Sequence, residues 1–248
     1  NQVSFHQLSM LLASQAIVLH TFRHGDSSVI ARMYTRERGL VSFLIHGAKS
    51  KKGGNKTALL QPLSLLEVQM QLKENRGLQQ LREMRIDFPY SGIPFSTGKT
   101  AQVLFLAEVL IHTIKEEEQN DQLFDFLRDA LILLDQTPSE LPDFHLKFLL
   151  EFSRFLGFYP AENYCEATPY FQFTDGVFHH SPNSTCFDLP TSAALNQLMI
   201  TGFGSLQTGL FNRPMRRQVS RKLLEFFRWH LPSISGLQTP EVLEEVFG

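Results

Sequence analysis

The hydrophobic residues change their period partway along the chain, and this change constrains the fold more than any other feature. The first third contains short runs rich in β-branched and aromatic residues that partly alternate, as Val29, Ala31 and Met33 do against Ile30, Arg32 and Tyr34. From Thr100 onward they recur every three to four residues, which is typical of amphipathic helices. The sequence therefore predicts an α+β protein with a strand-rich first part and a mainly helical second part.

The strand-rich part has the dimensions of a small barrel. Short strands are expected over five segments, namely 15–22, 27–35, 39–48, 59–72 and 78–86. Glycine with polar neighbours separates them, as turns require, and Pro62 suits only an edge or the start of a strand. Five such strands predict an OB-fold barrel, which we assign to residues 10–88. Residues 1–9 are set apart as extra N-terminal residues, because Met10 is a suitable natural start.

The remaining residues, 89–248, are expected to form a mainly α-helical domain. An insertion at about 158–190 interrupts its helical period and is rich in proline, asparagine and aromatic residues. Within it, Asp175-Gly176 predicts a hairpin turn. Gly157, just before it, suits the C-terminal cap of a helix. A small irregular element is therefore expected inside the helical domain.

The net charge of −2 hides an uneven distribution of charge. Residues 1–85 contain 12 Lys/Arg against 5 Asp/Glu, and residues 200–230 contain 6 against 1. Residues 115–170 contain 4 against 12. Because local basic patches attract polyanions whatever the overall balance, the basic segments are candidates for nucleic-acid contact.

The most concentrated basic segment is GAKSKKGGNK, residues 47–56, in which lysines and glycines occur together without an acid. An OB barrel holds single strands in a basic groove, and a glycine-rich loop adapts to a phosphate backbone without base specificity. The alternative is a solvated loop, since lysines also serve solubility. The candidate contacts in and around this loop are Arg23, Arg36, Arg38, Lys49, Lys51, Lys52 and Lys56.

A second basic segment lies near the C-terminus, in NRPMRRQVSRKLLEFFRWH. Its arginines recur at helical spacing, so they predict a helix with one basic face, which either binds a polyanion or faces water. Pro214 and Trp229 are expected to be structural. The candidate nucleic-acid contacts here are Arg213, Arg216, Arg217, Arg221 and Lys222.

Several other classes of protein receive little support. No apolar run reaches the length of a membrane span, and no export signal precedes the first strand. Cys165 and Cys186, the two cysteines, are expected to be free thiols in a reducing cytoplasm. Five residues rather than four separate Gly92 from Gly98-Lys99, so this segment departs from a phosphate-binding loop. No catalytic constellation is apparent, and we expect no enzyme.

Several stretches together resemble a known family. AIVLHTFRHGDSSVIARMYTRERGLVSFLIHGAKSKK, LQPLSLLEV and LQQLREMR are similar to the N-terminal barrel of RecO, the bacterial recombination mediator. LGFYP at a helix end and RRQVSRKLLEFFRWHL near the C-terminus are similar to the rest of that family. The resemblance extends over nearly the whole chain from Met10.

The resemblance implies a function as well as a fold. It implies binding of single- and double-stranded DNA, annealing of complementary strands, and help in loading RecA onto DNA coated by single-strand-binding protein. The implied partners are RecR and the C-terminal tail of single-strand-binding protein, with no membrane and no small-molecule substrate. The implied location is the bacterial cytoplasm, with nucleoid association during repair.

The family also suggests a zinc site and a tail-binding site. Many RecO-like sequences carry two CxxC pairs, but here Thr168 stands where the partner of Cys165 would be, so we expect no metal and no cofactor. The only candidate ligands are Cys165, His179, His180 and Cys186. For an acidic tail the candidates are Lys147, Phe148, Phe152 and Arg154. A core-facing phenylalanine stripe explains those residues equally well.

Two rival functions remain open at this point. In one, the chain is a non-catalytic adaptor whose barrel binds a partner protein rather than DNA. In the weaker one, Gly98-Lys99-Thr100 serves a nucleotide-dependent enzyme.

Overall fold

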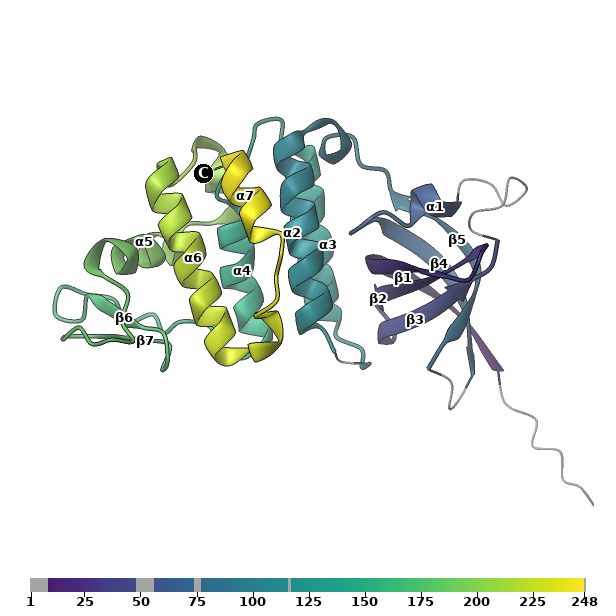
Figure 1. The fold of residues 1–248 in the computed structure, drawn as a ribbon, viewed down its shortest axis with the longest axis horizontal. Helices are drawn as coiled ribbons and strands as arrows, with labels where there is room; N and C mark the ends of the chain where they lie inside the picture. The colour runs from purple at the N-terminus through teal and green to yellow at the C-terminus, as the bar shows by residue number, and fades with distance from the viewer. Residues whose placement is uncertain (1–8, 48–55, 74–76, 116, 248) are drawn as a thin grey trace, which may run out of the picture. The chain divides into compact units, whose positions relative to one another are not determined.

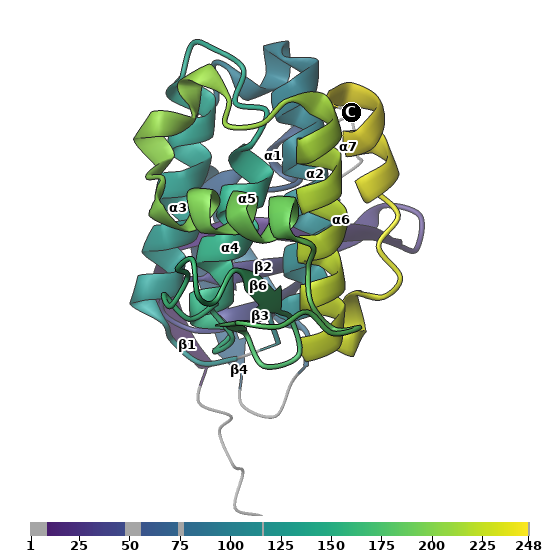
Figure 2. The same ribbon diagram turned by 90° about the vertical axis from the view of Figure 1, so that its left-hand side faces the viewer.

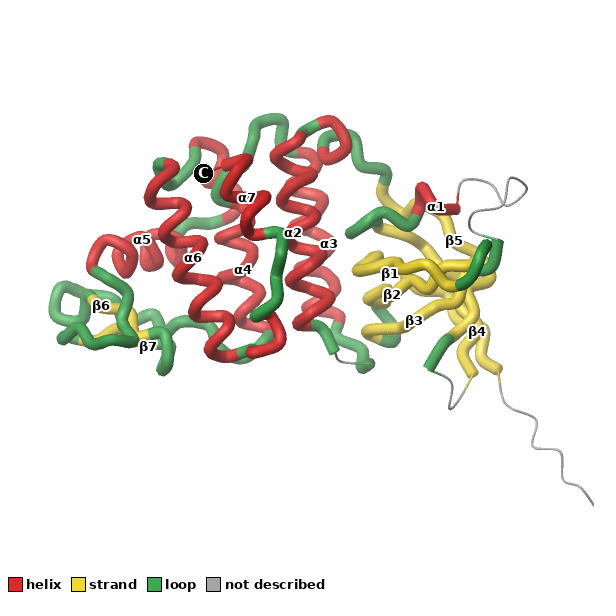
Figure 3. Tube along the Cα trace, viewed as in Figure 1, coloured by secondary structure: helices red, strands yellow, loops and turns green. Residues whose placement is uncertain are grey.

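The computed structural model describes residues 9–47, 56–73, 77–115 and 117–247. Five strands with one short helix among them come first, and a mainly helical part follows (Figures 1 and 3), so the expected barrel and helical part are confirmed. The chain forms two compact units. Unit 1 holds the chain up to Tyr90 together with Ile114–Ile132, and unit 2 holds Ser91–Thr113 and the chain from Leu133.

Unit 1 is built on a closed five-stranded barrel with the strand order β1-β2-β3-β5-β4. Its elements are β1 (Ser9–His24), β2 (Ser28–Thr35), β3 (Gly39–Ile45), α1 (Lys56–Leu59), β4 (Leu65–Lys73) and β5 (Gln79–Phe88). The first half of β1 pairs with β4 and the second half pairs with β2, with a bulge between Val18 and His20. The parallel pairs Phe43–Gln79 and Leu44–Gln80 close the barrel.

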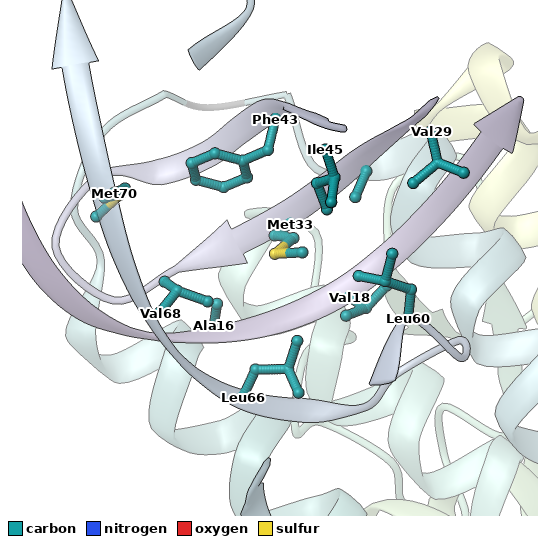
Figure 4. Packing of buried hydrophobic residues seen from close by; sticks show 11 residues of the cluster. Ala16, Val18, Val29, Met33, Phe43, Ile45, Leu60, Leu66, Val68 and Met70 are labelled. Carbon is teal, nitrogen blue, oxygen red and sulfur yellow. The ribbon is translucent and has the colours of Figure 1, made fainter. Parts of the chain in front are cut away.

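The alternating residues of the strands meet inside this barrel. Figure 4 shows side chains from β1, β2, β3 and β4 converging on Met33 and Phe43, both of which are fully buried. Removing such side chains from water supplies the main driving force for the fold, about 25 cal/mol per Å² of apolar surface. The expected fourth strand starts later than predicted, at Leu65, because Pro62 and the turn around it precede the ladder.

The first turns of α3 (Asp121–Gln136) belong to unit 1 and cover part of the outer surface of β2. Phe124 stacks on Tyr34 with ring centroids 6.2 Å apart. Arg128 forms an ion pair with Asp87 at 3.2 Å. This part of the barrel wall is therefore closed to a ligand by the protein itself.

Unit 2 is mainly helical, and its other helices lie around α4 (Figure 2). Most residues of α4 are buried. Its elements are η1 (Ile93–Phe95), α2 (Thr97–Thr113), the end of α3, α4 (Phe144–Phe155), β6 (Tyr170–Gln172), β7 (Val177–His179), α5 (Leu189–Ile200), η2 (Phe203–Thr208), α6 (Arg213–His230), η3 (Pro232–Ile234) and α7 (Pro240–Phe247). Among the described residues, no helix combines the length and apolar character that a membrane crossing would need.

A buried ion pair ties the parts of unit 2 together. Arg216 on α6 contacts Asp143, just before α4, with Nε 2.7 Å from Oδ1. The same guanidinium donates hydrogen bonds to the carbonyls of Phe211 and Phe247 at 2.7 and 3.0 Å. Asp143 also accepts a hydrogen bond from the Phe211 amide. Because buried charges need such partners, this cluster orders the start of α4, the segment before α6, and α7.

The insertion is a small hairpin stabilised by aromatic packing. β6 and β7 pair antiparallel, and Gly176 turns between them at φ 70°, as the Asp175-Gly176 pair predicts. Phe171 lies 5.1 Å from Phe178 and 5.4 Å from Phe226 of α6, measured between ring centroids. Gly157 has φ 82° after α4, which confirms the expected C-terminal cap.

Candidate nucleic-acid interface

Arg23 lies near the end of β1, beside the turn that leads to β2. It is exposed and pairs in register with Val29, and Gly25 in the turn has φ 66°. The end of β3 reaches the same turn, since Ser28 Oγ lies 3.1 Å from His46 Nδ1. Arg23 therefore stands where β3 leaves the barrel toward the lysine-rich segment.

Only one lysine of that segment lies among the described residues. Lys56 is exposed at the start of α1. Lys49, Lys51 and Lys52 lie outside the described residues, so their part in a DNA interface stays a prediction.

Arg36 and Arg38 flank the β2–β3 turn, at the end of β2 opposite to Arg23. Arg36 forms an ion pair with Asp125 on α3, and its guanidinium carbon lies 5.1 Å above the Phe124 ring. Arg38 is exposed, with a nitrogen 3.8 Å from the Met10 sulfur. Arg36 is thus occupied within unit 1, whereas Arg38 stays available to a phosphate.

The strands present further residues that the sequence reasoning missed. On the outer surface, His20, Arg32 and Ser42 form one row across β1, β2 and β3. Phe22, Ile30 and Leu44 form the next row. We call His20, Phe22, Arg32, Ser42, Leu44 and His46 the β1–β3 face. Alternation in VLHTFRH puts His20, Phe22 and His24 on one side of the strand, but it puts the core residue Val18 on that side too. The bulge between Val18 and His20 turns the three residues outward, and the sequence pattern does not reveal this bulge.

The β1–β3 face combines an exposed aromatic ring with positive charge. Phe22 is 43% exposed and stacks on His20, with ring centroids 6.0 Å apart. Arg32 is half-buried and has no ion-pair partner among the described residues. Exposed rings that stack on bases and arginines that bind phosphates are the usual elements of single-strand binding on OB folds.

The arginines of α6 fall into two groups. Arg216 is buried in the cluster with Asp143, so its guanidinium is not available to DNA. Arg213, Arg217 and Arg221 are exposed. Arg217 pairs with Glu244 of α7 at 2.7 Å. Lys222, half-buried, pairs with Glu225 at 2.7 Å, so Arg213 and Arg221 are the better candidates for contact with a polyanion.

The expected tail-binding residues lie mostly inside unit 2. Phe148, Phe152 and Lys147 are all buried. Lys147 Nζ donates to the carbonyls of Leu198 and Met199 at 3.0 and 3.2 Å, at the end of α5. Here the ammonium satisfies carbonyls that lack helical partners. An acidic peptide cannot reach these three side chains in this arrangement.

Arg154 is the remaining candidate for a protein partner. Its side chain is 46% exposed and pairs with Glu151 at 2.8 Å and Glu162 at 3.5 Å. Its guanidinium carbon lies 3.3 Å above the ring of Tyr159. Burial alone would raise the pKa of Glu151, but hydrogen bonds from Lys147 and Arg154 lower it. Glu151 therefore stays ionised and holds Arg154 in place beside the tyrosine.

The segment that resembles a phosphate loop has a structural role instead. Lys99 Nζ donates to the carbonyls of Asp135 and Thr137 at 3.1 and 2.6 Å, at the end of α3. Burial alone would raise the pKa of Asp135, but hydrogen bonds from Ser91, Gly92 and Ile93 lower it. The adjoining cavity of roughly 630 Å³ is lined by two acids, Asp135 and Glu140. Two carboxylates and an occupied lysine do not suit a nucleotide phosphate.

The four candidate zinc ligands do not form a metal site among the described residues. No group of three or more His, Cys, Asp or Glu side chains is placed there to hold an ion. Cys165 Sγ lies 3.1 Å from Thr168 Oγ1, and this hydrogen bond lowers the pKa of the thiol. Cys186 pairs with Gln172 in an isolated bridge, and His179 and His180 stand at the end of β7. The residues present do not fit tetrahedral zinc, which needs four ligands.

Comparison with known proteins agrees with this architecture. A family model described as "Recombination protein O N terminal" matches residues 10–90, and "Recombination protein O C terminal" matches residues 96–235. The chain is 34% identical over 241 residues to a protein of Bacteroides fragilis named DNA repair protein RecO. Proteins of the same name from Flavobacterium psychrophilum and Porphyromonas gingivalis are 31% and 30% identical. Each alignment covers 96% of this chain and 100% of the relative, and the chain therefore belongs to the RecO family.

Proposed function

We propose that this chain is a non-catalytic DNA-binding protein of recombinational repair. It binds single- and double-stranded DNA, anneals complementary strands, and helps to load RecA onto DNA coated by single-strand-binding protein. Family membership supports this function, and the β1–β3 face is the observation from which we assign DNA contacts to particular residues. There Phe22 is exposed beside His20, and Arg32 lies in the next row without an acidic partner among the described residues.

The proposed mechanism is electrostatic binding combined with stacking. Arg32, together with Arg23 and Arg38 at opposite ends of β2, contacts phosphates and so binds any sequence. Phe22 stacks on the face of a base. Stacking leaves the hydrogen-bonding edge of that base free, so a bound strand can still pair with its complement. Annealing then needs no covalent step and no cofactor.

The proposed partners are RecR and the acidic tail of single-strand-binding protein. Because Lys147, Phe148 and Phe152 are buried, Arg154 is the basic residue on α4 that remains for the tail. A basic residue beside an apolar ring is the element that an acidic, hydrophobic peptide requires, and Tyr159 supplies the ring.

The test measures fluorescence anisotropy of a labelled, mixed-sequence single strand at several salt concentrations. We expect binding to weaken linearly in log salt, with a slope of about −0.7 per phosphate contacted. Phe22→Ala and Arg32→Ala should each weaken binding about fivefold or more, and Arg32→Ala should also flatten the slope. Lys49/Lys51/Lys52→Ala should reduce the slope of log affinity against log salt concentration further.

The matched control is Arg85→Ala on β5, an exposed barrel arginine outside the β1–β3 face that pairs with Glu67. It should bind DNA like the unchanged protein. Equal losses from Arg85→Ala and Arg32→Ala would remove the β1–β3 face from the interface. No binding at low salt would overturn DNA binding itself and favour the adaptor function.

A further inference from the structure

One face of α6 carries a row of arginines along most of the helix. Arg213, Arg217, Arg221 and Arg228 are exposed and separated by four, four and seven residues. Residues at these spacings lie on the same side of an α-helix. At 1.5 Å per residue the row extends over about 22 Å. It is therefore a line of positive charge rather than a compact cluster.

Most of this charge is not neutralised inside unit 2. Arg213, Arg221 and Arg228 have no ion-pair partner among the described residues. Arg217 pairs with Glu244 but keeps 55% of its side chain exposed. The only acid on α6 is Glu225, which is paired with Lys222. The row is accordingly free to attract an extended anion.

An exposed tryptophan directly follows the last arginine of the row, about 100° further round the helix. Trp229 is 58% exposed and contacts Phe173 edge to face, with ring centroids 6.0 Å apart and an angle of 77°. Phe173 is buried, and its carbonyl lies 3.1 Å from Nε2 of His230. Phe173 thus supports the indole, while much of the ring faces solvent.

We propose that the exposed surface of α6 is a second strand-binding surface, on which the four arginines contact phosphates of one strand and Trp229, beside Arg228, stacks on a base. The proposal rests on the DNA binding proposed above and adds a site on unit 2 to the site on the barrel. A polynucleotide carries one charge per residue along its whole length, as this row requires. An acidic peptide with apolar side chains would need a groove to receive those side chains as well as basic contacts. A protein with two such surfaces can hold two strands at once, as annealing requires.

The chain contains a single tryptophan, so the tryptophan emission of the protein reports on Trp229 alone. The experiment titrates unlabelled oligothymidylate into the full chain and follows tryptophan emission, with anisotropy of a labelled strand measured in parallel. We expect saturable quenching that disappears as salt is raised. Trp229→Ala should lower the affinity of the α6 surface for the strand by about fivefold or more. Trp229→Phe should keep most of that affinity. Arg221→Ala/Arg228→Ala should lower the salt slope by about 1.4, at 0.7 per lost phosphate.

Phe95→Ala is the matched control, because Phe95 is an 87% exposed aromatic residue of unit 2 outside the row. It should change neither quenching nor affinity. Thermal melting of each variant separates loss of binding from loss of folding.

The outcomes distinguish this proposal from the proposed function. Anisotropy that shows binding, with unchanged tryptophan emission and normal binding by Trp229→Ala, would overturn the α6 site and leave the barrel site standing. Quenching by an acidic, aromatic peptide but not by oligothymidylate would assign the face to a protein partner instead. No binding by the unchanged protein at low salt would overturn both.

Discussion

Arg216 and Arg221 lie five residues apart on α6, and we expect their replacement to have different consequences. Arg216→Ala removes the partner of Asp143, whose side chain is fully buried, and leaves the carbonyls of Phe211 and Phe247 without their donor. Breaking a buried ion pair from one side costs about 3–5 kcal/mol. For a chain of this size that predicts a fall in Tm of about 6–20 °C.

Comparison with Arg221→Ala tests whether the stabilisation comes from the buried ion pair of Arg216. Arg221 is exposed without an ion-pair partner among the described residues, so its loss should change stability by no more than about 0.5 kcal/mol. Differential scanning calorimetry of both variants measures the difference directly. The double variant Arg216→Met/Asp143→Leu removes both charges, so no unpaired carboxylate stays buried. It should therefore be more stable than Arg216→Ala. Equal Tm values for Arg216→Ala and Arg221→Ala would refute the structural role of the buried pair.

Three further predictions concern unit 2. Burial, with Arg216 nearby, lowers the pKa of His145 from 6.5 to about 3, so the unfolded chain binds this proton first and stability should fall with decreasing pH. Between pH 6.5 and 5 the free energy of unfolding should fall by an amount approaching about 2 kcal/mol, at 1.36 kcal/mol per pH unit. Urea denaturation of His145→Gln should show a free energy of unfolding that depends less on pH. Lys147→Met should lower Tm, because the last carbonyls of α5 lose their donor; an unchanged Tm would contradict that capping role. Elemental analysis of the purified protein should find well under one zinc per chain, and Cys165→Ser should melt normally; a full equivalent of zinc would contradict this.

The sequence predicts well the features that depend on local pattern. Alternation in 27–35 predicts β2, because side chains on a strand point to opposite sides at every step, and β-branched and aromatic residues in 39–48 predict β3. The Asp175-Gly176 turn and the cap at Gly157 follow from the backbone angles that glycine alone adopts easily. The family resemblance also rests on local stretches, and the comparisons confirm it.

The candidate site is less predictable, because exposure and pairing depend on residues distant in the sequence. Arg36 and Arg38 look equivalent in RERG, yet α3 brings Asp125 to Arg36, and Arg38 stays exposed. The β1–β3 face required the register of three strands before Phe22, Arg32 and Leu44 could be seen as neighbours.

The sequence by itself determined the order of strands and helices, the turns between them and the position of the basic segments, since each depends on residues close together in the chain. Only the tertiary structure decided which charged groups are available. Burial makes an unpaired charge costly, so Arg216, Lys147 and Lys99 are held by carbonyls and carboxylates from other segments. Exposed arginines such as Arg38 and Arg221 carry no such cost, and they keep their charge for a partner outside the protein.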